Sequence, residues 1–179
     1  MAKLFFRYAA MNAGKSTALL QVAHNYEERG HRVRIFTARL DDRYGRGYVT
    51  SRLGPQREAE QFDADTDFVA LMGDNPGIAC ILIDEAQFLS RRQVQLRNLP
   101  AICYGLRTDF QGELFPGSAA LLALADEMDE MKTICDCGRK ATMNMRVDAN
   151  NRKVTEGAQV EIGGNVRYRS VCGRCFRQG

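Results

Sequence analysis

The segment from residue 4 to residue 17 holds residue types that bind phosphate. It reads Leu-Phe-Phe-Arg-Tyr-Ala-Ala-Met-Asn-Ala-Gly-Lys-Ser-Thr, which predicts a short apolar strand, a tight loop and the start of a helix. Backbone N–H groups of such a loop and the positive end of the helix dipole can surround a polyphosphate. We expect the Lys15 ammonium group to reach the outer phosphates and the Ser16 hydroxyl to ligate Mg²⁺. The residues expected to form this nucleotide site are Ala9, Ala10, Met11, Asn12, Ala13, Gly14, Lys15 and Ser16.

One position departs from the phosphate-loop pattern. The first glycine of G-x-x-x-x-G-K-[ST] falls at residue 9, where this chain has Ala9. Alanine costs little there if its φ is negative, but it is strained if φ is positive. Because a Gly-Lys-Ser sequence also arises by chance, the loop alone is only a moderate signal for nucleotide binding.

A second motif ends in two neighbouring carboxylates. The apolar run Ile81-Leu82-Ile83 is followed directly by Asp84 and Glu85. A carboxylate at a strand tip can hold Mg²⁺ through water, which suits Asp84. Glu85 can take a proton from an attacking hydroxyl or position an attacking water. The alternative is an acidic pair that only stabilises a helix N-terminus.

Four cysteines form two closely spaced pairs, Cys135-x-Cys137 and Cys172-x-x-Cys175. Two such pairs can enclose one tetrahedral Zn²⁺. Four thiolates leave no open position for a catalytic water, so we expect a structural zinc site. Two disulfides or free thiols are the alternatives, and a cytosolic location disfavours disulfides.

Composition sets the class of protein. The chain has 179 residues, 45% of them hydrophobic and 26% charged, with a net charge of +3. This predicts one globular domain, or one plus a small appendage. No apolar run approaches the ~20 residues of a membrane helix, and the N-terminus lacks a signal-peptide pattern, so we expect a cytoplasmic protein without a membrane partner. Its positive residues are scattered, which does not indicate stable nucleic-acid binding.

Strands that alternate with helices predict an α/β fold with a mostly parallel sheet. The predicted strands are residues 3–9, 32–38, 78–83, 101–106 and 132–134. The predicted helices are residues 15 to about 29, 68–72 and 117–128. Residues 41–67 are predicted to form a long polar loop with short local structure, in which Asp41 or Arg43 either lies beside the phosphates or is merely solvated. The connection 89–99 is short for a parallel crossover and has room for a stubby helix at most.

After Cys135 the helix signals disappear and turn residues become frequent. This predicts a boundary that separates a domain of residues 1–133 from a smaller one of residues 134–179. Four aromatic residues are flanked by polar residues or glycine rather than by an apolar stripe. Each is more often core or rim than ligand contact, but together they could form a slot for a flat base. They are Phe88, Phe110, Phe115 and Tyr168.

Taken together, the three motifs resemble the thymidine kinase family, in the zinc-containing form (type II) shared by bacteria and the animal cytosol. The segments that carry the resemblance are residues 10–17, 84–88, 104–110 and 162–175. The resemblance implies a RecA-like phosphate-loop domain and a small C-terminal zinc-ribbon-like domain that carries a lasso-shaped lid.

The resemblance also implies an ATP:thymidine 5′-phosphotransferase, which transfers the γ-phosphate of ATP to the 5′-hydroxyl of thymidine. It implies that Glu85 is the general base, that Asp84 lies behind the Mg²⁺, and that Ala86 and Gln87 complete the nucleotide site. It further implies a homotetramer and feedback inhibition by dTTP. The substrate residues implied are Met11, Phe88, Leu106, Phe110, Gln159, Val160, Glu161, Ile162, Gly163 and Tyr168.

Two other classes of function compete with a nucleoside kinase. In a nucleoside triphosphate hydrolase or motor, Glu85 would activate water, but the sensor elements usual in such proteins are not identifiable. In a zinc-ribbon module for nucleic acids, binding would depend strongly on salt. The modest charge and the phosphate loop argue against the second class.

Overall fold

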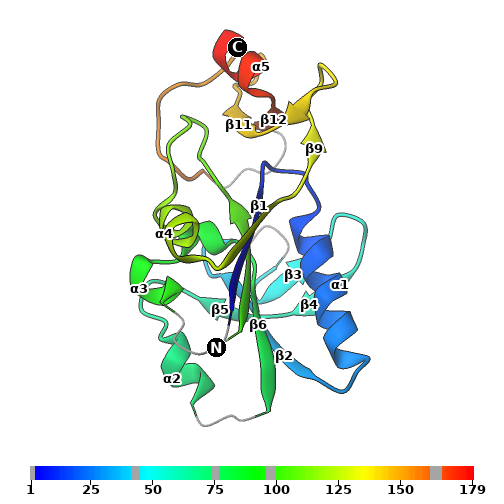
Figure 1. Cartoon of the computed structure of the whole chain (residues 1–179). Helices are drawn as coiled ribbons and strands as arrows, with labels where there is room; N and C mark the ends of the chain where they lie inside the picture. Colours follow the sequence, from blue (N-terminus) through cyan, green and yellow to red (C-terminus); the bar gives the residue numbers. More distant parts are fainter. Residues whose placement is uncertain (1–2, 42–44, 74–76, 96–99, 162–166) are drawn as a thin grey trace.

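A six-stranded sheet forms the centre of the computed structural model, which describes residues 3–41, 45–73, 77–95, 100–161 and 167–179. The strand order is β5-β2-β6-β7-β1-β8, and every neighbouring pair is parallel (Figure 1). The strands are β1 (Leu4–Ala9), β2 (Arg32–Ala38), β5 (Glu60–Phe62), β6 (Ile78–Ile83), β7 (Ala101–Leu106) and β8 (Glu127–Glu130). The predicted α/β class with a mostly parallel sheet is confirmed.

Successive side chains of the central strands point to opposite faces of the sheet, and this divides the core into two layers. In β6, Ile81 and Ile83 pack with one cluster, whereas Cys80 and Leu82 pack with the other, and all four are at most 1% exposed. Successive side chains of a strand point to opposite faces, so an unbroken apolar run suits a strand covered on both sides. Helices α2 (Phe68–Met72), α3 (Arg91–Val94) and α4 (Pro116–Leu124) cover the first face, and α1 (Lys15–Glu27) covers the second.

The predicted helix over residues 117–128 is wrong at its C-terminal end. Helix α4 stops at Leu124, and Glu127–Glu130 forms strand β8 at the sheet edge, beside β1. The Asp126 carboxylate accepts a hydrogen bond of 2.7 Å from the backbone N–H of Leu4. Residues 125–128 carry good helix formers, but pairing with the otherwise open edge of β1 outweighs that local preference.

The predicted long loop contains the expected short structure and one element more. Strands β3 (Tyr48–Thr50) and β4 (Gln56–Glu58) form an antiparallel hairpin, and β5 joins the main sheet, which the loop prediction missed. In the short connection 89–99, α3 is a single turn with a capping box, which agrees with the prediction of a short helix at most.

The C-terminal region, residues 133–161 and 167–179, lies at one end of the sheet (Figure 1). Its elements are β9 (Thr133–Ile134), β10 (Lys140–Ala141), β11 (Met143–Arg146), β12 (Tyr168–Val171) and α5 (Gly173–Gln178). The expectation that no helix follows Cys135 is therefore wrong. Helix α5 begins where the Cys172 side chain accepts a hydrogen bond from the backbone N–H of Cys175, a local cap that an apolar-period search does not detect.

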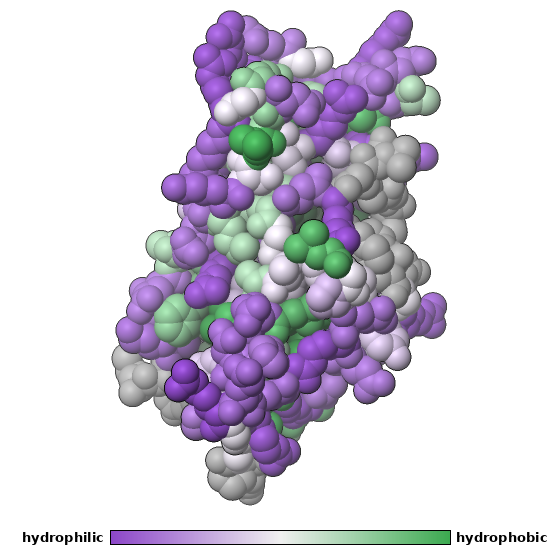
Figure 2. All heavy atoms as spheres, turned by 90° about the vertical axis from the view of Figure 1, so that its right-hand side faces the viewer, coloured by the Kyte–Doolittle hydropathy of each residue, from purple (hydrophilic) through white to green (hydrophobic). Residues whose placement is uncertain are grey.

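No helix in the described part of the chain is long and apolar enough to cross a membrane. Figure 2 shows one face, on which most residues are hydrophilic and the hydrophobic ones form small separate groups. Exposed large hydrophobic side chains include Leu53, at 81% exposure, and Ile134, at 70%. Scattered apolar residues of this kind are normal on a protein surface.

Candidate functional site

The phosphate loop connects β1 to α1. Ala9 is the last residue of β1 and lies in extended backbone, so the missing first glycine introduces no strain there. Positive φ values occur instead at Asn12 (63°) and Gly14 (76°). The Lys15 ammonium group donates to the Ala10 carbonyl at 3.0 Å, which keeps this side chain folded over the loop.

The carboxylate pair follows β6 and faces the start of α1. The Ser16 hydroxyl donates to the Asp84 carboxylate at 2.8 Å, and the Glu85 backbone N–H donates to the same carboxylate at 3.0 Å. Burial and then the neighbouring charge of Glu85 raise the pKa of Asp84 to about 7. Glu85 has a φ of 53°, a left-handed conformation that is unusual for a residue with a long side chain. The turn therefore aims two adjacent carboxylates in different directions.

Gln87 holds this turn against the neighbouring strand. It lies in the short 3₁₀ helix η1 (Ala86–Phe88) and is 1% exposed. Its amide nitrogen donates to the Glu85 carboxylate, and its amide oxygen accepts from the backbone N–H of Leu106 at 3.0 Å. The resemblance implied that Gln87 belongs to the nucleotide site, and its contacts add that its amide group links Glu85 to Leu106.

Sequence reasoning missed Gly117, which allows α4 to pack on the same turn. A Cβ at this position would lie 2.6 Å from the carbonyl oxygens of Ala86 and Leu89 and 2.7 Å from that of Gln87. Only a residue without a side chain permits this approach. The Pro116-Gly117 pair at the start of a predicted helix was the one available signal.

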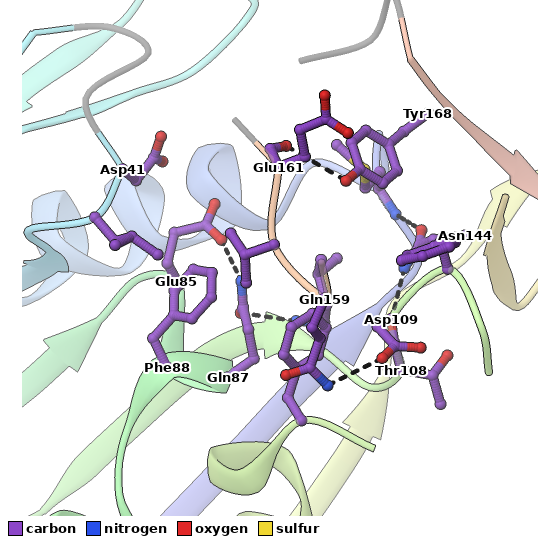
Figure 3. A pocket seen from close by; sticks show the side chains of 16 residues that line it. Asp41, Glu85, Gln87, Phe88, Thr108, Asp109, Asn144, Gln159, Glu161 and Tyr168 are labelled. Atoms are coloured by element: carbon purple, nitrogen blue, oxygen red, sulfur yellow. Dashed lines mark hydrogen bonds between the residues drawn. The ribbon is translucent and has the colours of Figure 1, made fainter. Parts of the chain in front are cut away.

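A pocket opens between the carboxyl ends of the strands and the C-terminal region (Figure 3). Its walls include the aromatic rings of Phe88, Phe110, Phe115 and Tyr168. Eight of the ten substrate residues suggested above line it: Met11, Phe88, Leu106, Phe110, Gln159, Val160, Glu161 and Tyr168. The other two, Ile162 and Gly163, lie outside the described residues. Lining residues that were not predicted for this pocket are Leu40, Asp41, Gln87, Thr108, Asp109 and Asn144.

A second hollow surrounds the phosphate loop. It is lined by residues 11–17, by Thr50–Leu53 of the β3–β4 hairpin and by Glu85 and Leu106. The Arg52 side chain reaches from the hairpin to the Asn12 amide oxygen, a contact that the sequence did not reveal. Three residues line both hollows, namely Met11, Glu85 and Leu106. Four predicted nucleotide residues are at most 4% exposed and line neither hollow, namely Ala9, Ala10, Asp84 and Ala86.

A buried arginine supports the wall of the pocket opposite Glu85. The Arg146 guanidinium lies 3.7 Å from the ring centroid of Phe110 and donates to the Tyr168 hydroxyl at 2.6 and 3.0 Å. It also donates to the Ala158 carbonyl at 2.8 Å and pairs with the Glu161 carboxylate at 3.4 Å. Arg146 therefore anchors residues 158–161, three of which were expected to contact the substrate. Its partners are distant in sequence, which is why the motifs did not identify it.

The four predicted metal ligands gather at one point, with their sulfur atoms all within 4.8 Å of one another. The pKa of Cys135 is lowered chiefly by a hydrogen bond from the backbone N–H of Cys137. The pKa of Cys172 is lowered in the same way by the backbone N–H of Cys175. The pKa of Cys175 is raised because its thiol shares hydrogen bonds with the other sulfurs. Four cysteines in such a cluster are a donor set suited to Zn²⁺.

Comparison with known proteins points to one family. The family model for thymidine kinase matches residues 2–176. A thymidine kinase of Chromobacterium violaceum is 61% identical in an alignment of 183 positions that covers 98% of each chain. A thymidine kinase of Ruegeria pomeroyi is 55% identical and one of Yersinia pestis is 52% identical, each over 99% of this chain and at least 95% of the relative. Because the match extends over nearly the whole length on both sides, the chain belongs to the thymidine kinase family.

Proposed function

We propose that this protein transfers the γ-phosphate of ATP to the 5′-hydroxyl of thymidine, producing ADP and thymidine monophosphate. The observation that carries the proposal is the junction of the two hollows at Met11, Glu85 and Leu106. One hollow contains a phosphate loop and the other is an aromatic-walled pocket. A phosphate donor and an acceptor bound in them would meet beside the Glu85 carboxylate.

In the donor hollow, the backbone N–H groups of residues 11–16 are proposed to bind the phosphates of ATP. The Lys15 ammonium group neutralises charge on the outer phosphates, and Ser16 and Asp84 form the cation-binding edge. These two residues would hold Mg²⁺, which would supply positive charge to offset that of the phosphates. The hydrogen bond between Ser16 and Asp84 keeps the hydroxyl and the carboxylate side by side, where both could supply oxygen ligands to Mg²⁺, directly or through water.

In the acceptor pocket, we propose that Phe88 and Phe110 contact the nucleoside and that Leu106 and Met11 lie beside it. Gln159, Val160, Glu161 and Tyr168, with Ile162 and Gly163, form the lid. Backbone groups of a lid can read the polar edge of a pyrimidine, and closure excludes water from the transferred phosphoryl group. The bond of 2.9 Å from the Gln159 amide to the Asp109 carboxylate keeps the lid close to the sheet.

Glu85 is proposed to be the general base. Its carboxylate accepts the proton of the 5′-hydroxyl as the oxygen forms a bond to the γ-phosphorus. The bond between that phosphorus and the oxygen bridging to the β-phosphate breaks, and ADP leaves with the electron pair. The Gln87 amide, which donates to the Glu85 carboxylate, restricts the carboxylate to the orientation that faces the junction.

We further propose that Cys135, Cys137, Cys172 and Cys175 hold one structural Zn²⁺. Tetrahedral ligation with Zn–S bonds of ~2.3 Å separates sulfur atoms by roughly 3.8 Å. The Sγ atoms of Cys137 and Cys172 are 3.6 Å apart, which fits that geometry. Zinc, when bound, would cross-link two segments of a region that has little apolar core of its own.

Several properties are proposed on family membership alone. They are a cytoplasmic location, a homotetrameric assembly, and a division into domains at residues 1–133 and 134–179. Inhibition by dTTP also has a physical reason, since dTTP carries both the base that suits the acceptor pocket and a triphosphate that suits the loop. It could therefore occupy the two hollows together.

A coupled assay of ADP formation with ATP and a panel of nucleosides tests the proposal. We expect turnover only in the presence of a nucleoside, with thymidine the best acceptor. ATP hydrolysis at the same rate without nucleoside would overturn the proposal and favour a hydrolase. Deoxycytidine and deoxyguanosine serve as matched negative acceptors, because both carry the same deoxyribose with its 5′-hydroxyl but a different base.

A further inference from the structure

Both polar backbone groups of Met11 are held by side chains of the C-terminal region. The Met11 N–H donates to the amide oxygen of Asn144 at 2.8 Å. The Ser170 hydroxyl donates to the Met11 carbonyl at 2.5 Å. Met11 belongs to the phosphate loop and lines both hollows. The path of the loop is therefore set partly by residues more than a hundred positions away.

The two side chains come from one cross-strand pair. Asn144 in β11 lies directly opposite Ser170 in β12. The Asn144 amide nitrogen donates to the Thr108 carbonyl at 3.1 Å, so its oxygen is fixed toward Met11. Asn144 is only 3% exposed. Two adjacent strands thus present one acceptor and one donor to a single residue, and the pair is rigid because the strands are paired along Met143–Arg146.

The phosphate loop has an irregular backbone, which contacts from other parts of the chain can stabilise. Asn12 and Gly14 both have positive φ values, so the loop does not follow a regular hydrogen-bonded path of its own. Thr133, just before the first cysteine pair, adds a weaker contact of 3.3 Å to the Asn12 carbonyl. At the other end, Val171 of β12 leads directly into Cys172. The contacts to the loop and the cysteine cluster therefore share one small framework.

We infer that Asn144 and Ser170 are positioning residues through which the C-terminal region sets the conformation of the phosphate loop, and hence the affinity for ATP. This rests on the proposed function. The C-terminal region accordingly serves both substrates: its lid closes on the nucleoside, and its Asn144–Ser170 pair orders the loop that binds the triphosphate.

Ser170 is the better residue to test, because Asn144 also lines the acceptor pocket whereas Ser170 lines neither hollow. Ser170→Ala removes the hydroxyl that donates to Met11, and Ser170→Thr restores a hydroxyl at the same position. Arg169→Ala serves as the matched control, since it changes an exposed neighbour in β12 whose side chain contacts Asn151 and Asp136 rather than the loop.

The experiment measures the dissociation constants of thymidine and of a non-hydrolysable ATP analogue with Mg²⁺ by calorimetry, together with zinc content. One hydrogen bond is worth about a two- to tenfold change in binding. We expect Ser170→Ala to weaken analogue binding by that factor with thymidine binding and zinc unchanged, Ser170→Thr to recover it, and Arg169→Ala to match the wild type.

Equal analogue affinities for wild type and Ser170→Ala overturn the inference. So does a parallel loss of both ligands or of zinc, since that pattern indicates a merely structural role. A wild-type protein that binds both ligands but forms no ADP with thymidine contradicts the proposed function instead, and this separates the two failures.

Discussion

The phosphate-loop region (residues 4–17 and 84–88) and the C-terminal region place their functional groups by different means. The first is attached to the ends of β1 and β6, whose residues Phe6, Ile81, Leu82 and Ile83 are fully buried. The second has a core of four buried residues, two of which are cysteines: Cys135, Ala141, Val171 and Cys172. Units below about 70–80 residues rarely gain enough stability from a single apolar core, and natural ones often add a metal or disulfides. A packed sheet positions the proposed donor site, whereas the proposed zinc cross-link would position the proposed acceptor lid.

The two regions also differ in electrostatics and in where unusual backbone lies, because in the C-terminal region the residue other than glycine with positive φ is Asn151, in an exposed bend. The phosphate-loop region contains two residues other than glycine with positive φ, Asn12 and Glu85, and a buried carboxylate, Asp84. A large core can maintain such unfavourable features at a functional site. In the C-terminal region the buried charged group, Arg146, is surrounded by partners. Substitutions in the two regions should therefore change different measured properties.

Removal of one zinc ligand is predicted to have the largest effect. Cys175→Ser should lower the zinc content from about one per chain to nearly none and raise the KM for thymidine more than about 100-fold, because the lid loses its anchor. Metal analysis and steady-state kinetics measure both. Cys80→Ala, which alters a buried cysteine of β6, should retain the zinc. If the metal-free variant kept its affinity for thymidine, the proposed role of the cross-link would be wrong.

Substitution of the buried Arg146 is predicted to weaken the binding of thymidine but not that of ATP. Arg146→Gln removes the guanidinium group that stacks on Phe110. It also removes most of the hydrogen bonds to the Tyr168 hydroxyl and the Ala158 carbonyl. We expect the KM for thymidine to rise about 10- to 100-fold and the KM for ATP to stay within about twofold. Arg152→Gln at an exposed position provides the control. A parallel rise in both KM values would contradict a lid-specific role.

A smaller effect is expected for the stability of the donor site. Because the pKa of Asp84 is raised in the folded protein, the folded state binds this proton more tightly than the unfolded chain. The group's favourable contribution is complete below its ordinary pKa of 3.8 and is lost as pH rises toward about 7. Asp84→Asn cannot ionise, so in metal-free buffer it should raise the thermal midpoint by about 2–8 °C at pH 8.

At pH 5 the same substitution should give a smaller gain, because Asp84 is still largely protonated in the folded protein but already mostly ionised in the unfolded chain, so that only about a third of its contribution has been lost. Thermal unfolding at the two pH values measures the difference. Asp65→Asn, at an exposed carboxylate, should leave the midpoint unchanged at both. A gain that is the same at pH 5 and pH 8 would show that ionisation of Asp84 is not its cause.

Local motifs made the donor site and the cysteine cluster predictable from sequence. Gly14-Lys15-Ser16, the run ending in Asp84, and the two cysteine pairs each carry their chemistry within a few positions, and fully buried strands read as apolar runs. Strand β8 was not predictable, because Glu127–Glu130 is polar and becomes a strand only through its pairing with β1.

The supporting residues were hidden for a related reason. Asn144, Arg146 and Ser170 act on partners that the fold brings near, such as Met11 and the Ala158 carbonyl. No spacing rule within one segment contains that information. The sequence thus predicts which groups carry the chemistry, whereas the structure shows what holds them in place.

Glu85→Gln tests the central claim, that donor and acceptor meet at the Glu85 carboxylate, most directly. The measurement is the rate of a single turnover with ATP and thymidine, together with the dissociation constant of each ligand. We predict that the rate falls about 10²- to 10⁴-fold while both dissociation constants stay within about threefold of the wild type. A variant that binds both ligands and turns over at a near-normal rate would contradict the account.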